Sequence, residues 1–208
     1  MSKDIVQIFK DINSIITNSH IVYTSGKHGS FYINKDGLYP YPKRVSEVCK
    51  MFAEKYQNED IDVVIGPALG GIILSTWTAY HLSELENKEI LGIFTEKDEN
   101  NNQIFKRGYD KIVQGKNVLV LEDVTNTGGS VKRVVDAVKQ AGGNVVAACV
   151  MVNRQPKIVN SEFVGAPFSS LGVIEAEVFE EVDCPLCKKN IPINTDVGHG
   201  KKYLANKK

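Results

Sequence analysis

Two adjacent carboxylates, Glu122 and Asp123, directly follow a run of apolar residues, and this is where the chain offers its clearest chemistry. The run Val118–Leu121 predicts a buried strand, and apolar residues at helical spacing after Ser130 predict a helix. The loop between them, Thr125–Ser130, consists of small residues. A strand, a Gly-rich turn and a helix N-terminus form an anion site, because unpaired backbone N–H groups and the helix dipole converge there. Carboxylates repel phosphate, so the pair should serve sugar hydroxyls or a metal, and the combination indicates a sugar phosphate.

Each part of this motif also has a plain structural explanation. Gly128 and Gly129 are compatible with an ordinary tight turn, Ser130 with a helix N-cap, and the two carboxylates with a solvated strand end. The strand and helix predicted on either side favour the ligand site. Neither Gly-x-Gly-x-x-Gly after a strand nor Gly-x4-Gly-Lys-Ser/Thr occurs in the sequence.

The composition limits the class of protein. The 208 residues suit one α/β domain or a domain with extensions, and a hydrophobic content of 42% can supply a sizeable core. Lys+Arg and Asp+Glu both number 25, which argues against partners held by bulk charge, so we expect neither nucleic acid nor a membrane as a partner. The N-terminus has no apolar signal core and no apolar run approaches the ~20 residues of a membrane span, which predicts a cytoplasmic protein. Four cysteines are too few for a disulfide scaffold.

The predicted elements place the motif in a parallel sheet. Residues 3–16 have the apolar spacing of an amphipathic helix, and Val22–Asp36 resembles a hairpin. Strands and helices then alternate, which implies helices on both faces of the sheet and ligands beyond the carboxyl ends of the strands. The expected helices are Pro42–Tyr56, Gly71–Leu85 and Val131–Ala141, and the expected strands are Ile61–Ile65, Ile90–Thr95, Val118–Leu121 and Asn144–Val152.

One long polar connection, Glu96–Gly108, interrupts this alternation. Loops of this length are either mobile surface excursions or active-site lids, and position alone favours neither.

The sequence resembles a known family in several segments. Residues 118–130 resemble the phosphoribosyl-pyrophosphate (PRPP) signature of type I phosphoribosyltransferases, which by itself indicates only the superfamily. Other segments resemble orotate phosphoribosyltransferases, and the similarity extends over roughly residues 20–190. These segments are Thr24–Asp36 (the hood), Ile61–Ile72 (the pyrophosphate loop), Phe94–Lys97 and Phe105–Gly108 (the ends of the catalytic loop), Val150–Arg154 (the strand that ends at an orotate-binding Arg) and Cys184–Cys187 (a tail found in some members).

The resemblance implies an architecture and a reaction. Residues 1–208 would form a single phosphoribosyltransferase domain, with a hood from about 1–40 and part of 155–208 and a core of about 42–155. It would be a type I phosphoribosyltransferase-like parallel sheet flanked by helices. The enzyme would transfer the 5-phosphoribosyl group from PRPP to orotate, as a homodimer whose mobile loop reaches the neighbour's site.

The resemblance also implies roles for individual residues. Glu122 and Asp123 would bind the ribose hydroxyls, with Asp123 near the positive charge of the transition state. Mg²⁺ would be held through substrate oxygens rather than by protein ligands. Lys97, Lys106 and Arg107 would be the catalytic loop cations, and Asn126 and Arg154 would contact orotate. The remaining PRPP-binding residues would be Val124, Thr125, Asn126, Thr127, Gly128, Gly129 and Ser130 around the 5-phosphate, and Ala68, Leu69 and Gly70 at the pyrophosphate.

Four departures from the family pattern leave alternatives open. Glu96 stands where the catalytic loop usually has Arg, and the loop lacks His. Leu69 and Gly70 stand where many members have an aromatic residue and a Lys, and Asn126 replaces a Thr that commonly touches orotate. The alternatives are a type I phosphoribosyltransferase for another nucleobase and a non-catalytic PRPP-binding regulator. Arg154 favours orotate, because a purine has no carboxylate for it to bind, and the chain lacks the basic stripe expected of a nucleic-acid-binding regulator.

The pair Cys184 and Cys187 has two interpretations. It could be half of a zinc site with His199 as a third ligand, but no second Cys pair is present to complete four ligands. A structural turn with free thiols is therefore favoured. His28, in the predicted hood turn, is either a phosphate contact or an exposed turn residue.

Overall fold

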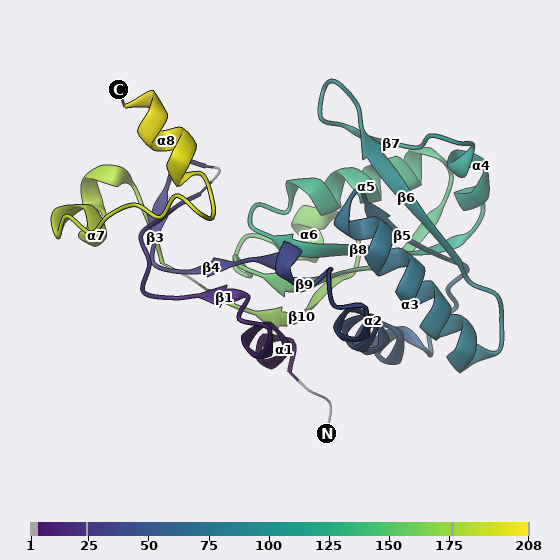
Figure 1. The fold of residues 1–208 in the computed structure, drawn as a ribbon. Coiled ribbons are helices and arrows are strands. Elements are labelled where there is room, and N and C mark those ends of the chain that lie inside the picture. The colour runs from purple at the N-terminus through teal and green to yellow at the C-terminus, as the bar shows by residue number, and fades with distance from the viewer. Residues whose placement is uncertain (1–3, 24, 176, 208) are drawn as a thin grey trace. The chain divides into compact units, whose positions relative to one another are not determined.

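The computed structural model describes residues 4–23, 25–175 and 177–207 and divides into two compact units (Figure 1). The core unit contains residues 4–6 and Tyr39–Ile174, and the second unit contains the described residues of Gln7–Leu38 and Glu175–Lys208. Thr24, the first residue of the segment that resembles a hood, lies outside the described residues. Residues 1–3, which contributed to the expectation that the N-terminus has no signal core, also lie outside them.

The core unit is built on a six-stranded sheet in the order β10-β9-β8-β5-β6-β7. All neighbouring pairs are parallel except β6–β7, which is antiparallel. This confirms the predicted parallel sheet. The strands are β5 (Val63–Pro67), β6 (Leu91–Lys97), β7 (Gln103–Ile104), β8 (Asn117–Thr125), β9 (Asn144–Asn153) and β10 (Phe168–Val173).

Helices cover the two faces of the sheet (Figure 1). Helix α5 (Gly129–Gln140) contributes four valines to an apolar cluster that includes Val63 and Ile65 of β5 and Val118 and Val120 of β8. Since side chains alternate along a strand, Val64 and Leu119 point to the opposite face, where α3 (Gly70–Glu86) contacts β5 and β8. Helix α2 (Pro42–Tyr56), which has the predicted bounds, packs on α3.

Short helices complete the core unit. Helix α4 (Tyr109–Val113) lies between β7 and β8, and α6 (Ser161–Val164) lies between β9 and β10. Asn160 caps α6, since its side chain accepts a hydrogen bond from the Phe163 amide. Helix α1 (Ile5–Asp11) begins in the core unit and continues into the second unit.

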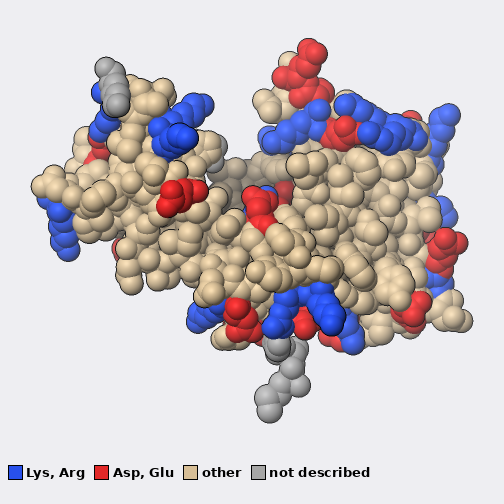
Figure 2. Space-filling view, in the orientation of Figure 1, with Lys and Arg blue, Asp and Glu red and all other residues tan. Residues whose placement is uncertain are grey.

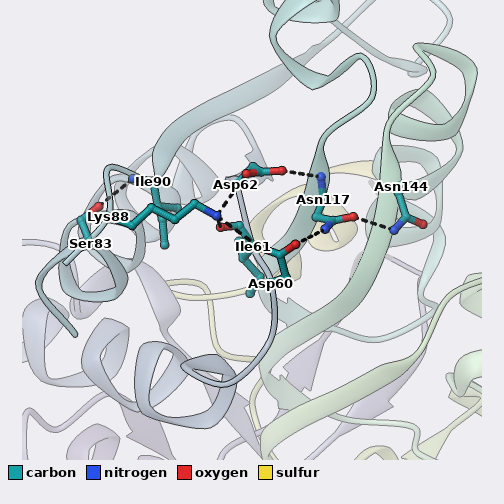
Figure 3. Close-up of polar contacts among 8 residues, drawn as sticks. All are labelled: Asp60, Ile61, Asp62, Ser83, Lys88, Ile90, Asn117 and Asn144. Atoms are coloured by element: carbon teal, nitrogen blue, oxygen red, sulfur yellow. Dashed lines mark hydrogen bonds and ion pairs between the residues drawn. The ribbon is translucent and has the colours of Figure 1, made fainter. Parts of the chain in front are cut away.

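A polar network fixes the amino ends of the strands, opposite the edge that carries the signature (Figure 3). Lys88 forms ion pairs with Asp60 at 3.3 Å and Asp62 at 3.2 Å. The second carboxylate oxygen of Asp62 accepts the amide N–H of Asn117, the first residue of β8. The Asn117 side chain in turn accepts a hydrogen bond from Asn144 at the start of β9. This network links the neighbouring strands β5, β8 and β9 at the amino edge of the sheet.

The second unit consists of very short elements. Strands β1 (Ile15–Ile16) and β4 (Tyr32–Ile33) form one antiparallel pair, and β11 (Val178–Phe179), β3 (His28–Gly29) and β2 (Ile21–Val22) form a three-stranded sheet. The helical turns are η1 (Lys35–Gly37), η2 (Glu181–Asp183), α7 (Pro185–Lys188) and α8 (Gly200–Asn206). Its two segments are joined by the β3–β11 pairing, by a bridge between His20 and Ile193, and by a hydrogen bond from the Asn194 side chain to the Ser19 hydroxyl.

Three sequence-based expectations differ from the structure. The predicted helix 3–16 ends at Asp11, because Asn13 adopts a left-handed conformation and Ile15–Ile16 pairs with Tyr32–Ile33 instead. The predicted hairpin Val22–Asp36 is shorter, since β2 pairs with β3 across the turn after Tyr23 while β4 pairs with β1. The long connection after Thr95 is largely an ordered hairpin, in which β6 continues to Lys97 and pairs with β7.

Charge is mixed over the surface of the core unit. Figure 2 shows Lys and Arg side chains gathered along the edge that lies over β7 and α4 in the view of Figure 1, with acidic side chains among them. Among the described residues, no helix is long and apolar enough to cross a bilayer.

Candidate active site

The order of the strands places a topological switch point between the carboxyl ends of β5 and β8, where a ligand-binding crevice is expected. These strands are neighbours, but the chain leaves β5 towards β6 on one side and leaves β8 towards β9 on the other. Ligands of open α/β sheets bind at such a switch point, outside the carboxyl ends of the strands. The loop at Ala68–Gly70 follows β5, and the signature loop follows β8, so both predicted loops border this crevice.

The acidic pair lies within β8 rather than after it. The strand continues through Glu122 and Asp123 to Thr125, four residues beyond the predicted end. Alternation along the strand therefore directs the two carboxylates to opposite faces. Asp123 is buried, whereas Glu122 is partly exposed.

Asp123 is held by a tyrosine that the sequence did not single out. The Tyr39 hydroxyl donates to Oδ2 of Asp123 at 2.9 Å, and the Val124 amide donates to Oδ1 at 2.6 Å. Gly70, at the start of α3, lies so close that an added Cβ would meet both the Tyr39 hydroxyl and Oδ2 of Asp123. Tyr39 precedes α2 without any motif around it, so only its position in the fold reveals its contact with Asp123.

The signature loop turns sharply into helix α5. The Thr125 hydroxyl accepts the Gly128 amide at 2.9 Å, and Gly128 adopts a left-handed conformation with φ of 73°. A Cβ on Gly128 would lie 2.6 Å from the Phe163 ring, so the position requires glycine for its conformation and for space. Asn126 and Thr127 are exposed, while Gly129 and Ser130 form the first turn of α5. The amides of a first helical turn have no acceptor within the helix, which leaves them available to an anion.

The loop after β5 is held close to the end of that strand. The Ala68–Leu69 peptide bond is cis, and the Ala68 amide donates to the Thr95 carbonyl at 2.8 Å. The Leu69 side chain is 82% exposed, so it is not part of the core. Gly66 and Gly71 pack so closely that a Cβ on Gly66 would lie 2.7 Å from the Gly71 Cα. This contact draws the start of α3 against the end of β5.

Arg154 follows directly after β9. Its amide donates to the Thr125 carbonyl at 3.0 Å, which ties it to the end of β8. The preceding residue, Asn153, is buried and donates from its side chain to the Val159 carbonyl at 3.0 Å. The base of Arg154 is therefore fixed next to the signature loop.

The predicted loop cations make their ion pairs with the hairpin itself. Lys106 and Arg107 both pair with Glu96, the residue that stands where the family pattern has Arg. Arg107 also lies over the Phe94 ring, with the guanidinium 5.4 Å from its centre. Lys97 is exposed and lies opposite Gln103 in the β6–β7 pairing. Among the described residues, the structure thus brings Lys106 and Arg107 together at Glu96, not at the acidic pair.

Comparison with known proteins identifies the class of protein to which this fold belongs. Residues 35–165 match the family model described as "Phosphoribosyl transferase domain". The orotate phosphoribosyltransferase of Thermoanaerobacter sp. (strain X514) is 39% identical over 191 residues, covering 92% of this chain and 94% of the relative.

Two solved structures share the fold. The orotate phosphoribosyltransferase of Mycobacterium tuberculosis H37Rv superposes with a TM-score of 0.63 at 20% identity, over 83% of this chain and 97% of the other. The adenine phosphoribosyltransferase of Thermoanaerobacter pseudethanolicus superposes with a TM-score of 0.60 at 16% identity, over 80% of this chain and 99% of the other. The chain therefore has the fold of these phosphoribosyltransferases, and the match to the family model shows that it belongs to that class of protein. Its sequence relatives further show that it belongs to the orotate phosphoribosyltransferase family.

Proposed function

We propose that the crevice between β5 and β8 carries out the family's reaction, the transfer of a 5-phosphoribosyl group from PRPP to orotate. In this reaction the bond between ribose C1 and the pyrophosphate oxygen breaks, and orotate N1 bonds to C1. The principal support is the arrangement of Asp123, which Tyr39 and the Val124 amide orient beside the backbone of Gly70. A fixed carboxylate stabilises positive charge that develops in a transition state, because it needs no reorganisation when the charge appears.

The two loops of the crevice would hold the two ends of PRPP. The amides of the first turn of α5, together with the hydroxyls of Thr125, Thr127 and Ser130, would bind the 5-phosphate. The backbone of Ala68, Leu69 and Gly70 would approach the pyrophosphate, where the lack of a side chain on Gly70 leaves space. Glu122 and Asp123, on opposite faces of β8, would accept hydrogen bonds from different ribose hydroxyls.

The donor set of the crevice suits a magnesium ion that arrives with PRPP. Asp123 and Glu122 offer hard oxygen ligands, yet in the described part of the chain the one group of three or more metal-ligating side chains lies elsewhere, in the second unit. The ion would therefore take most of its ligands from substrate oxygens. When bound, it would neutralise charge on the leaving pyrophosphate.

Orotate recognition would depend on Arg154 and Asn126. A guanidinium can bind the orotate carboxylate through two parallel hydrogen bonds. The Asn126 side chain, which is exposed on the signature loop, offers one donor group and one acceptor to the base. Because an adenine phosphoribosyltransferase has the same fold, the choice of base would come from such side chains and not from the fold.

The cations of the β6–β7 hairpin would act as the closing loop. Lys97, Lys106 and Arg107 would bind pyrophosphate and exclude water once PRPP is bound. Closure would require Lys106 and Arg107 to exchange Glu96 for pyrophosphate oxygens. Surface ion pairs contribute only about 0–1 kcal/mol each, so a highly charged substrate would compete with Glu96 easily.

We further propose that the enzyme is a cytoplasmic homodimer that acts in pyrimidine synthesis. In this proposal the second unit would serve as the hood of a single phosphoribosyltransferase domain.

The direct test is the loss of orotate absorbance after addition of PRPP and Mg²⁺, with adenine, hypoxanthine, guanine and uracil in parallel. We expect turnover with orotate and with none of the other four bases, and we expect a chelator to abolish it. Asp123→Asn should lower kcat by about 100-fold or more, as loss of a preorganised electrostatic contact does. Asp136→Asn is the matched control, because Asp136 lies on the exposed side of α5 and pairs with Lys132. Turnover with another base would refute the orotate assignment, and PRPP binding without turnover of any base would favour the regulator.

A further inference from the structure

Four potential metal ligands meet in the interior of the second unit. They are His20, which precedes β2, His28 of β3, Cys184, which precedes α7, and Cys187 within α7. One ligand atom from each residue lies within 4.8 Å of all the others. His20, His28 and Cys184 are fully buried, and Cys187 is partly buried. The group belongs neither to the crevice between β5 and β8 nor to the proposed reaction.

Four of the six distances between the ligand atoms are close to those of a tetrahedral zinc site. Zn–N bonds of about 2.0–2.1 Å and Zn–S bonds of about 2.3 Å at tetrahedral angles place ligand atoms about 3.3–3.8 Å apart. In the structure, Nε2 of His20 is 2.9 Å from Nδ1 of His28 and 3.8 Å from Sγ of Cys184. Sγ of Cys187 is 3.3 Å from Nδ1 of His28 and 3.6 Å from Nε2 of His20. A small adjustment of the two histidines would match the ideal geometry.

The hydrogen bonds around the four residues leave Nε2 of His20 available to coordinate a metal. Nδ1 of His20 is 2.7 Å from the Ile191 carbonyl, so this nitrogen must carry the proton. Nε2, which faces the other three residues, therefore has a free lone pair. Metal-binding histidines commonly donate their second N–H to a carbonyl in this way, because the contact fixes the ring and its tautomer.

The surroundings of His28 also favour a ligand. Its Nε2 is buried without a hydrogen-bond partner among the described residues, and the Tyr203 ring packs edge-on against the imidazole at 5.1 Å. Without a cation, Nδ1 of His28 would donate a hydrogen bond to the lone pair of His20 Nε2 at 2.9 Å, and Nε2 of His28 would remain unpaired within the described part of the chain. Coordination of Nδ1 of His28 and Nε2 of His20 to one cation would replace this single hydrogen bond by two bonds to the metal.

We propose that His20, His28, Cys184 and Cys187 bind a structural zinc ion. Two thiolates and two imidazoles in a tetrahedral arrangement are a ligand set that zinc prefers, and four protein ligands leave no open position for catalysis. The ion would join β2 and β3 from the N-terminal segment to α7 from the C-terminal segment. In the described part of residues 175–208, Cys184 is the one buried apolar side chain, and small segments with so little core commonly depend on a metal or disulfides.

The site differs from the one that the cysteine spacing suggested. His199 is exposed at the start of α8 and is not among the four residues, and both histidine ligands lie about 160 positions away from the cysteines. His28 is buried in β3, so it is neither an exposed turn residue nor accessible to phosphate. The pair Cys184 and Cys187 is half of a ligand set whose other half lies near the N-terminus.

The proposal is tested by the metal content of the untagged protein after gel filtration in dilute chelator. About one zinc ion per chain is expected from the four-ligand site, and Cys184→Ser and Cys187→Ser should each retain about a tenth of it or less. Cys49→Ser is the matched cysteine control, because burial raises the pKa of Cys49 to about 12 and keeps its thiol protonated. His199→Asn is the matched histidine control. Both control variants should retain the metal.

A second measurement does not depend on the folding of variants. Replacement of zinc by Co²⁺ in the wild-type protein should give the visible bands of tetrahedral cobalt and the near-ultraviolet bands of cobalt–thiolate bonds. Wild-type protein with no retained metal and no cobalt–thiolate bands would overturn the proposal. A mass lower by two hydrogens, which indicates a Cys184–Cys187 disulfide, would also overturn it, as would loss of metal from His199→Asn to the same extent as from Cys187→Ser.

Discussion

Replacing Tyr39 by Phe should weaken catalysis by a calculable amount. The substitution removes the hydroxyl that donates to Oδ2 of Asp123 at 2.9 Å and leaves the ring in place. A hydrogen bond to a charged group contributes about 1.5–3 kcal/mol. Because the Val124 amide still donates to the other oxygen at 2.6 Å, we expect the lower end of this range. About 1.5 kcal/mol corresponds to about a tenfold loss of kcat/KM.

The assay is the decrease in orotate absorbance at varied PRPP concentration, with thermal unfolding measured on the same samples. Tyr41→Phe is the control, since Tyr41 is only two positions away and its side chain is 51% exposed. It should leave both kinetic constants and the melting temperature unchanged. If Tyr39→Phe keeps kcat/KM within about twofold of wild type, a change of less than about 0.5 kcal/mol, then Tyr39 does not position Asp123 for the reaction. Rescue of Tyr39→Phe by a raised PRPP concentration would assign the tyrosine to substrate binding alone.

Three further predictions concern the signature loop, the hairpin and the amino edge of the sheet. Gly128→Ala should raise KM for PRPP and destabilise the fold by about 2–4 kcal/mol, because it adds overpacking against Phe163 to a strained conformation. Gly115→Ala, at a similar φ but in open space, should destabilise the fold by only about 1–2 kcal/mol. Equal losses of stability in thermal unfolding would contradict this. Glu96→Gln should lower KM for PRPP about two- to fivefold at low salt, because it frees Lys106 and Arg107 from weak surface ion pairs. An unchanged or higher KM would contradict the proposal that these cations exchange Glu96 for pyrophosphate. The Asn117 amide and then Lys88 hold the pKa of Asp62 below its usual value, so its contribution to stability is present above the unfolded-state pKa and is lost as pH falls through the folded-state pKa. Asp62→Asn should therefore destabilise the protein at pH 7 and cost progressively less towards pH 3, and a pH-independent difference in denaturant unfolding would rule out the carboxylate as the cause.

The alternating part of the chain was predictable because its elements bury continuous apolar stripes. The bounds of Pro42–Tyr56 agree with the apolar spacing, and the parallel sheet follows from the order of strands and helices. The end of β8 was misplaced, because Glu122 and Asp123 are polar, and a polar pair normally signals the end of a buried strand. Here the strand carries these side chains to the edge of the sheet where the crevice lies.

The second unit was less predictable, because its contacts join distant segments. Ile15 and Ile16 continue the apolar spacing of a helix, yet pairing with Tyr32 and Ile33 determines their conformation.

The β6–β7 hairpin of the core unit was also not predicted, since an Asn-rich sequence gives no strand signal. Its turn is stabilised by Asp98, whose carboxylate accepts hydrogen bonds from Asn100 and Asn102.

The composition of the second unit from the two ends of the chain has a consequence for synthesis on the ribosome. Tyr39–Ile174 is complete, and can begin to fold, before residues 175–208 exist. The segment Gln7–Leu38 must meanwhile wait without β11 and without either cysteine. His20 and Cys184 are 164 positions apart, and closing a loop of that length in an unfolded chain costs about 4–5 kcal/mol. A segment made before the core unit is therefore among the last to reach its final structure, and a chain that stops at Ile174 would leave it permanently without its partners.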